Sequence, residues 1–144
     1  MNYWIEVTSG LRWSRMLKKG VVLKAPNETR YKNLFKDVRA GDRTLHYLTA
    51  SLTSDKRYKS TIVASSRIIS DPIMTTMSIS AMCNNVNIFP KQIHVKKIKE
   101  LNINSDGLKS LLNINMQRYL TKMNESDYKS IIHIYPDNAR TIKR

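Results

Sequence analysis

The first ten residues constrain the fold more than any other stretch of the chain. Tyr3, Ile5 and Val7 alternate with Trp4 and Glu6, and aromatic and β-branched residues dominate. This is the pattern of a buried β-strand. Thr8 and Ser9 are of the types that cap helix N-termini, and Gly10 permits a tight backbone turn. A helix is therefore expected over 11–19, directly after the strand.

The junction between this strand and this helix is the predicted ligand pocket. The first N–H groups of a helix have no partner inside it and favour small polar or anionic groups. Two hydroxyls, from Thr8 and Ser9, lie there beside the Trp13 indole. The hydroxyls either cap the helix or contact a ligand, and Trp13 is either a core residue or a platform for a base.

Charge is the second informative feature. The chain carries 25 Lys and Arg against 11 Asp and Glu, a net charge of +14, which favours a polyanion such as nucleic acid. The alternatives are charge that serves only solubility, or an acidic protein partner. Ten basic and three acidic residues lie between positions 12 and 43, around two amphipathic helices. The candidate phosphate-binding residues on these helices are Arg12, Arg15, Lys18, Lys19, Arg30 and Lys32.

The remaining chain mixes strand and helix patterns. Residues 73–87 contain methionines without a clear period, and we expect a loop over the sheet in which methionines fill irregular gaps. The C-terminal third has short helical patterns that are expected to cover one side of the sheet. The other expected elements are strands at 21–23, 43–48, 61–69, 88–89 and 93–98, a turn at 25–28, an exposed loop at 49–60, and helices capped by Thr29, at 106–112, at 116–123, and at 126–134 with Ser126 as N-cap.

Other function classes find little support. No apolar run approaches the roughly 20 residues of a membrane helix, and a single cysteine, Cys83, fits a reducing compartment. We therefore expect one cytoplasmic domain, residues 1–144, with no membrane, metal or cofactor, and its oligomeric state stays open. The three histidines, His46, His94 and His133, lack the spacing of a metal site, and Cys83 is expected to be a small buried hydrophobe. Catalysis is not predicted, although distant residues can assemble a triad in space.

A series of short motifs resembles the EVE domain, a family of PUA-like barrels related to the YTH readers of methylated RNA. The order and spacing of the motifs over nearly the whole chain carry the resemblance. It implies an α+β fold, namely a mixed β-barrel of PUA-like, EVE type with short flanking helices. The motifs are Tyr-Trp-Ile-Glu-Val-Thr-Ser at 3–9, Trp13, Lys-Lys-Gly-Val at 18–21, Arg-Tyr-Lys-Asn at 30–33, Val-Arg-Ala-Gly-Asp at 38–42, Leu-His-Tyr at 45–47, Ile-Ser-Asp-Pro at 69–72, Phe-Pro-Lys-Gln-Ile-His-Val at 89–95 and Ser-Asp-Tyr-Lys-Ser-Ile-Ile at 126–132.

The resemblance also implies a binding mode. EVE and YTH domains take a flipped or unpaired modified base into a pocket at the end of the first strand, where aromatic side chains stack on it. Thr8, Ser9 and Gly10 match the strand-end segment, Trp13 the aromatic of the first helix, and Arg30 and Lys32 the basic segment before the turn.

The cage differs from the family pattern. Val22 stands where many relatives carry a Trp wall of the cage, and no aromatic residue lies between 73 and 88. Either Tyr47, Met74 and Met77 build a different pocket, or binding is mainly to the nucleic-acid backbone.

The sequence therefore predicts a non-catalytic nucleic-acid-binding module, for RNA or modified-base DNA, that takes up an unpaired base. The alternative is a small-molecule or protein-interaction sensing domain that uses the same pocket. The predicted pocket residues are Thr8, Ser9, Gly10, Trp13, Val22 and Tyr47.

Overall fold

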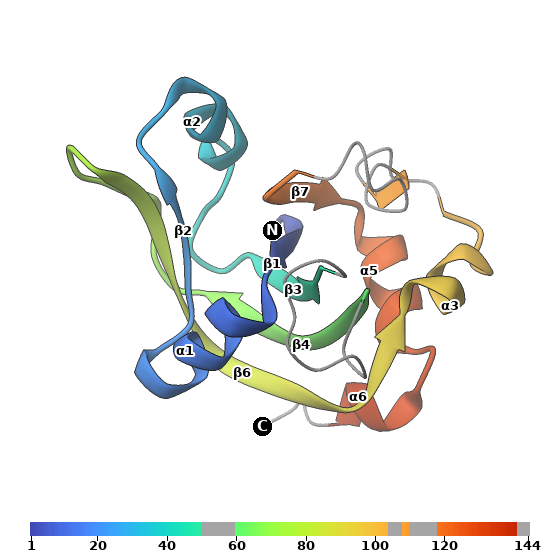
Figure 1. Cartoon of the computed structure of the whole chain (residues 1–144). Coiled ribbons are helices and arrows are strands. Elements are labelled where there is room, and N and C mark those ends of the chain that lie inside the picture. Colours follow the sequence, from blue (N-terminus) through green and yellow to red (C-terminus); the bar gives the residue numbers. More distant parts are fainter. Residues whose placement is uncertain (50–59, 104–107, 110–117, 141–144) are drawn as a thin grey trace.

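A curled sheet with short helices around it forms the molecule (Figure 1). The computed structural model describes residues 1–49, 60–103, 108–109 and 118–140. In chain order the elements are β1 (Tyr3–Thr8), α1 (Gly10–Lys19), β2 (Val22–Pro26), α2 (Thr29–Phe35), β3 (Arg43–Leu48), β4 (Thr61–Ile68), β5 (Ile73–Met74), β6 (Ser78–His94), α3 (Val95–Lys99), β7 (Leu120–Met123), α5 (Glu125–Ile132) and α6 (Pro136–Arg140). The predicted α+β class is confirmed.

The sheet has seven strands, in the order β2-β6-β4-β3-β1-β7, with β5 paired to β6 beside this path. Strand β1 runs parallel to β3 and antiparallel to β7, and the remaining pairs are antiparallel. The sheet curls into a half-barrel, so that its two end strands, β2 and β7, face each other across the opening (Figure 1).

Strand β6 produces much of this curvature. It is 17 residues long, pairs with β2 through its first part, and continues along β4. Its register against β4 shifts twice, and Asn85 near one shift has a φ of 49°, a left-handed conformation that asparagine tolerates. Because each extra residue bends the strand, β6 can serve both the body of the sheet and the arm that it forms with β2 and β5 (Figure 1).

Three apolar clusters fill the two faces of the sheet. The first joins β1, β3 and β4 to helices α3 and α5, through residues such as Ile5, Tyr47 and Ile131. The second lies between α2 and the arm and contains Trp4 and Phe35. The third packs α1 against β3 and β4, with Trp13, Met16, Val21, Leu48, Val63 and Ala64.

The predicted strand-to-helix junction is confirmed at the start of the chain. Strand β1 ends at Thr8, and Ser9 is the N-cap of α1, where its Oγ accepts the N–H of Arg12 at 3.1 Å. The helix ends at Gly20, which has a φ of 117° and donates its N–H to the carbonyl of Met16 at 2.7 Å. A positive φ of this size favours glycine, because it has no Cβ.

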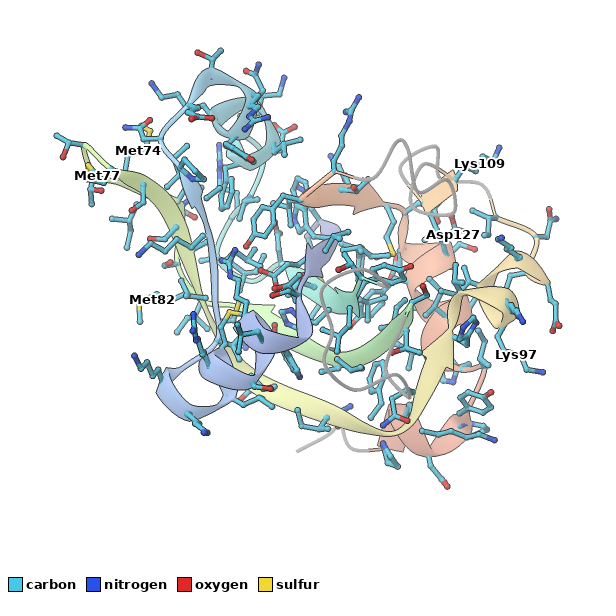
Figure 2. The ribbon with its side chains drawn as sticks, viewed as in Figure 1. Met74, Met77, Met82, Lys97, Lys109 and Asp127 are labelled. Atoms are coloured by element: carbon cyan, nitrogen blue, oxygen red, sulfur yellow. The ribbon has the colours of Figure 1, made fainter. Side chains whose placement is uncertain are left out.

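The predicted methionine-rich loop over 73–87 is wrong. Residues 73–74 form β5 and residues 78–94 form β6, so most of the segment is sheet. Met74, Met77 and Met82 project from the arm and are 63%, 81% and 52% exposed, and they therefore do not fill gaps in the core (Figure 2).

Several other boundaries differ from expectation. Residues 120–123 of the helix predicted over 116–123 form strand β7, and the strand predicted over 93–98 ends at His94, directly before α3 begins at Val95. Strand β2 continues through Pro26 into the predicted turn. The N-caps are Glu28 and Asn124 in place of Thr29 and Ser126. The strands predicted over 43–48 and 61–69 are confirmed as β3 and β4, whereas most of the predicted 49–60 loop and 106–112 helix lies outside the described residues.

Candidate functional site

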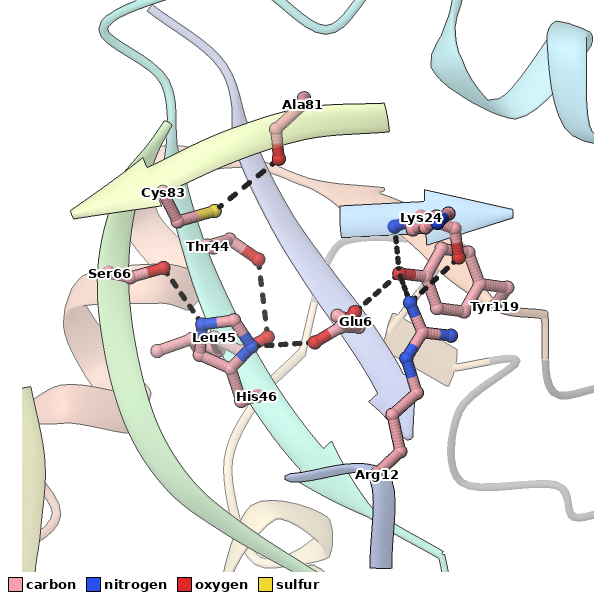
Figure 3. Close-up of polar contacts among 10 residues, drawn as sticks. All are labelled: Glu6, Arg12, Lys24, Thr44, Leu45, His46, Ser66, Ala81, Cys83 and Tyr119. Carbon is pink, nitrogen blue, oxygen red and sulfur yellow. Dashed lines mark hydrogen bonds and ion pairs between the residues drawn. The ribbon is translucent and has the colours of Figure 1, made fainter. Parts of the chain in front are cut away.

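A chain of buried polar side chains crosses the inner face of β1, β3 and β4 (Figure 3). Glu6 and His46 stand opposite each other in the β1–β3 register, and Nδ1 of His46 lies 2.8 Å from Oε1 of Glu6. On its other side, Nε2 of His46 lies 2.8 Å from Oγ of Ser66. If Nδ1 carries the proton, His46 donates to the carboxylate and accepts from the Ser66 hydroxyl, which satisfies both ring nitrogens.

This serine, histidine and carboxylate order is also the order of a hydrolytic triad. Here the three side chains are covered. Glu6 and His46 are 0% exposed and Ser66 is 3% exposed, and the Trp13 ring lies over the His46 ring at a centroid distance of 4.8 Å. With all three side chains buried, these hydrogen bonds join strands β1, β3 and β4.

Tyr119 extends this chain to the opposite edge of the sheet. It precedes β7 directly, donates its hydroxyl proton to Oε2 of Glu6, and accepts the backbone N–H of Lys24 in β2 at 2.8 Å. The Arg12 guanidinium donates to the same phenolic oxygen at 3.2 Å and to the Lys24 carbonyl at 2.8 Å (Figure 3). Side chains thus connect the two end strands of the half-barrel to helix α1.

Two groups beside this chain have raised pKa values. Burial, followed by the charge of Glu6, raises the pKa of Tyr119 well above its usual value, and Arg12 opposes the shift. Burial also raises the pKa of Cys83 to about 12. The Cys83 thiol is partly buried and packs with the apolar clusters of the arm and α1, which agrees with its predicted role as a small hydrophobe.

Two buried hydroxyl groups lie at the carboxyl ends of β1 and β3. These parallel neighbours end side by side, and Thr49 donates its backbone N–H to the carbonyl of Thr8 at 3.0 Å. The hydroxyl oxygens of Thr8 and Thr49 are both buried, and neither has a hydrogen-bond partner in the described part of the chain. A buried hydroxyl without a partner costs about 1–3 kcal/mol, so one such group at the end of each strand requires an explanation.

The other predicted pocket residues lie in two different places. Ser9 and Gly10 are at the same junction, and Val22 packs at the edge of the cluster that contains Trp13. Trp13 is 6% exposed and is built into that cluster through its contact with His46. The structure does not bring Tyr47 to this group, since the Tyr47 ring belongs to the cluster on the α5 side of the sheet.

The predicted phosphate-binding residues are exposed, with one exception. Arg15, Lys18 and Lys19 are exposed on α1, and Lys32 is exposed on α2. Arg30 is also exposed, but it pairs with Glu28 at 3.2 Å and its guanidinium lies 4.6 Å from the centre of the Tyr31 ring. Arg12 is the exception, because its guanidinium turns inward to Tyr119 and Lys24.

Thr49, Glu6 and Tyr119 carry no local sequence signal that predicts their place in this site. Thr49 follows a predicted strand as an ordinary polar residue, and only the absence of a partner for its hydroxyl makes it notable. Glu6 reads as the polar residue of an alternating strand, and Tyr119 was placed in a predicted helix. Their contacts link residues 40 and 113 positions apart, so no local pattern reveals them.

The described residues contain neither a candidate metal cluster nor a membrane-spanning helix. Within residues 1–49, 60–103, 108–109 and 118–140, no three His, Cys, Asp or Glu side chains lie close enough together to hold a metal ion. In the same part of the chain, no helix has the length and apolar character needed to cross a membrane.

The fold of the chain has solved counterparts. No protein-family model matches the sequence, and no curated protein matches it. The structure is similar to human THYN1 in complex with DNA containing 5-methylcytosine, with a TM-score of 0.64, 8% identity, and coverage of 93% of this chain and 97% of that one.

Two further structures widen the comparison. An ASCH protein from Zymomonas mobilis has a TM-score of 0.58, 7% identity and coverage of 92% and 94% of the two chains. The YTH domain of MRB1 from Zygosaccharomyces rouxii, in complex with N6-methyladenosine RNA, has a TM-score of 0.55, 12% identity and coverage of 92% and 85%. At these identities the likeness concerns the fold, and together with the curled mixed sheet it shows that the chain adopts the PUA-like fold.

Proposed function

We propose that this chain is a non-catalytic nucleic-acid-binding module of the EVE type, which takes an unpaired, modified base at the carboxyl ends of β1 and β3. The observation that carries the proposal is the pair of buried hydroxyls, Thr8 and Thr49, for which the described residues provide no hydrogen-bond partner. A base edge offers both donors and acceptors, so it can satisfy two hydroxyls that the fold leaves unpaired.

The surroundings of these hydroxyls suit a base. Ser9 and Gly10 lie at the start of α1, next to Thr8. Trp13 packs α1 against the sheet, and Val22 lies at the edge of the same apolar cluster. Trp13 contributes by holding α1 against β3, because its ring is covered. Tyr47 faces the other cluster, so its part in the proposal is to keep β3 in place.

The charge near the site supports a nucleic acid over a neutral ligand. Helix α1, which begins beside the proposed site, exposes Arg15, Lys18 and Lys19, and no acidic residue lies in its first turn. Phosphate groups on either side of a captured base would meet this helix. Arg12 supports the same helix from within through its bonds to β2 and Tyr119.

Two of the structures with the same fold contain nucleic acid with a methylated base. One is the DNA complex of human THYN1, and the other is the RNA complex of the MRB1 YTH domain. Both resemble this chain over more than nine-tenths of its length. They support a modified base as the ligand class and leave RNA and DNA as equal candidates.

Fluorescence anisotropy with short single-stranded oligonucleotides tests the proposal. RNA and DNA that contain N6-methyladenine or 5-methylcytosine are compared with the unmodified sequences at several salt concentrations. We expect affinity that falls as salt rises, by a slope of about 0.7 for each phosphate contact on a single strand, and a preference for one modified base. No binding at low salt, or binding that salt does not change, contradicts the proposal. A compact ligand with the same affinity for wild type and for an Arg15→Ala, Lys19→Ala variant would favour the sensing alternative.

A further inference from the structure

A recess lies between helix α2 and the arm, and no residue of β1, α1 or β3 lines it. It has a volume of about 470 Å³, which is within the range of small-molecule sites. Its cations stand on α2 and the turn that follows, and its apolar side comes from β5, β6 and the base of α2. The lining residues are Lys32, Phe35, Lys36, Arg39, Asp71, Pro72, Met74 and Ile79.

The charges around this groove are unbalanced in favour of an anion. Three cations, Lys32, Lys36 and Arg39, face a single carboxylate, that of Asp71. Asp71 already accepts the backbone N–H of Ala40 at 2.9 Å, which fixes it at the turn. The Arg39 guanidinium is also held in place, because it donates to the carbonyls at 36 and 38, at 2.9 and 2.7 Å.

The apolar side of the groove is exposed to solvent at Met74, and hydrogen bonds hold the neighbouring turn in position. Phe35 and Ile79 are each 1% exposed and form its floor, whereas Met74 is 63% exposed at its rim. The turn after Met74 is tightly bonded, since Oγ1 of Thr75 accepts the N–H groups at 77 and 78 at 3.2 and 3.0 Å. Asn27 ties this turn to β2 by donating Nδ2–H to the Thr75 carbonyl at 2.7 Å.

An exposed apolar side chain held beside three cations suits a ligand with a flat apolar part and a nearby anion. A nucleotide has both parts, because its base can lie on Met74 and the apolar floor while its phosphate meets the cations. An acidic peptide would use the cations but would leave the exposed methionine without a matched contact.

We propose that this groove binds a nucleotide of a single-stranded nucleic acid, next to the segment whose base is captured at the ends of β1 and β3. The inference rests on the function proposed above and extends the footprint from α1 to α2. The sequence predicted Lys32 as a phosphate-binding residue and offered Met74 as a possible pocket residue, and the structure adds Lys36 and Arg39.

The test compares two variants of equal charge. Lys32→Ala, Lys36→Ala removes two cations of the groove, and Lys97→Ala, Lys99→Ala removes two exposed cations of α3. Figure 2 shows Lys97 on the opposite side of the molecule from Met74. Both variants are titrated with the preferred modified base in oligonucleotides of about three and about nine nucleotides.

The groove variant should lose affinity for the longer oligonucleotide, with a salt slope reduced by about 0.7 for each lost contact. Its affinity for the shorter one, and its preference for the modified base, should match wild type. The α3 variant should lose less affinity for the longer one. Equal losses in the two variants, with the base preference kept, would overturn the groove while the proposed function survives. If the wild-type protein shows no preference for a modified base, the proposed function is overturned instead.

Met74 provides a readout that does not depend on charge. Met74→Ala should weaken binding of the longer oligonucleotide by about three- to tenfold, whereas Met82→Ala, on the same arm but outside the groove, should not. In methyl NMR spectra of the full chain, the Met74 signal should shift on addition of the oligonucleotide and the Met82 signal should stay. An unshifted Met74 signal, or a poly-glutamate peptide that binds the groove more tightly than nucleic acid, would overturn the inference.

Discussion

The phenolic oxygen of Tyr119 accepts the backbone N–H of Lys24 at 2.8 Å, although the two residues are 95 positions apart. Lys24 belongs to β2 and Tyr119 directly precedes β7, and these strands are the two ends of the sheet order. The same hydroxyl donates to Glu6, which joins the contact to the buried Glu6, His46 and Ser66 chain. The half-barrel is therefore held together across its opening by side chains.

Removal of that hydroxyl should loosen the half-barrel. Tyr119→Phe leaves the Glu6 carboxylate without one donor and the Lys24 N–H without its acceptor, so the free energy of unfolding should fall by about 2–3 kcal/mol. Urea denaturation measures the change. Tyr135→Phe is the control, because Tyr135 contacts the Lys91 ammonium through the face of its ring, which phenylalanine keeps. Equal stability of the two variants would contradict the bridging role.

Thr8→Val should have opposite effects on stability and on binding. Valine has nearly the shape of threonine but no hydroxyl, so it removes a buried oxygen without a partner, and the free energy of unfolding should rise by about 1 kcal/mol. Affinity for the modified base should fall, since the ligand loses one polar contact. In the control Thr44→Val, the lost hydroxyl donates to the Leu45 carbonyl, so stability should fall and binding should stay. A Thr8 variant with wild-type affinity would contradict the proposed pocket.

Arg12 and Arg15 should differ, although both were predicted to bind phosphate. Arg15 is exposed, so Arg15→Ala should leave the melting temperature unchanged and reduce the salt slope of nucleic-acid binding by about 0.7–0.9. Arg12 donates to Lys24 and Tyr119, so Arg12→Ala should also lower the melting temperature. Thermal unfolding and salt titrations separate the two effects, and identical behaviour of the variants would show that the inward contacts of Arg12 have no structural role.

Stability should decline in alkaline solution, partly through Tyr128. Burial raises the pKa of Tyr128 from 10.0 to about 12, so between these values the unfolded chain loses a proton that the folded chain keeps. The free energy of unfolding should therefore fall as pH rises from 10 towards 12, by about 1.4 kcal/mol per pH unit at most. Tyr128→Phe removes this contribution. The free energy of unfolding, measured by denaturation at several pH values between 9 and 11, should fall less steeply with pH in the variant than in wild type. Equal slopes would contradict the assignment.

Cys83 should be a slow thiol in the folded protein. Burial raises its pKa to about 12, so the reactive thiolate is scarce at pH 8. Labelling with a disulfide reagent should be at least about tenfold slower in native protein than in protein unfolded by urea. Rapid labelling of the native chain would show that Cys83 is more accessible than its packing with α1 and the arm implies.

Local patterns were sufficient for the elements whose buried face alternates clearly. Strand β1, helix α1, and strands β3 and β4 were predicted close to their observed bounds, because β-branched and aromatic residues alternate there and Ser9 and Gly20 mark the helix ends. The charge of α1 and α2 could also be located, since both helices are amphipathic. The motif order indicated the PUA-like fold that the solved structures share.

The strands of the arm and β7 could not be predicted from local hydrophobic patterns. In β6 the side chains at 79 and 81 that face the core alternate with an exposed methionine at 82, so apolar residues lie on both faces and hide the period. Strand β7 is four residues long and buries Leu120 and Met123, a spacing that also fits a helix. Whether such segments are strands depends on the partner strand that supplies their hydrogen bonds.

The sequence by itself determined that the chain starts with a strand that turns directly into a basic helix, and so it located Thr8, Ser9 and the cations of α1. Only the tertiary structure decided which polar groups are satisfied. It paired Glu6 with His46 and Tyr119, turned Arg12 inward, and placed Tyr47 on the other face. It also left the hydroxyls of Thr8 and Thr49 without partners among the described residues. The physical reason is that secondary structure follows from neighbours in the chain, whereas hydrogen bonding and burial depend on residues that meet only after the sheet has curled.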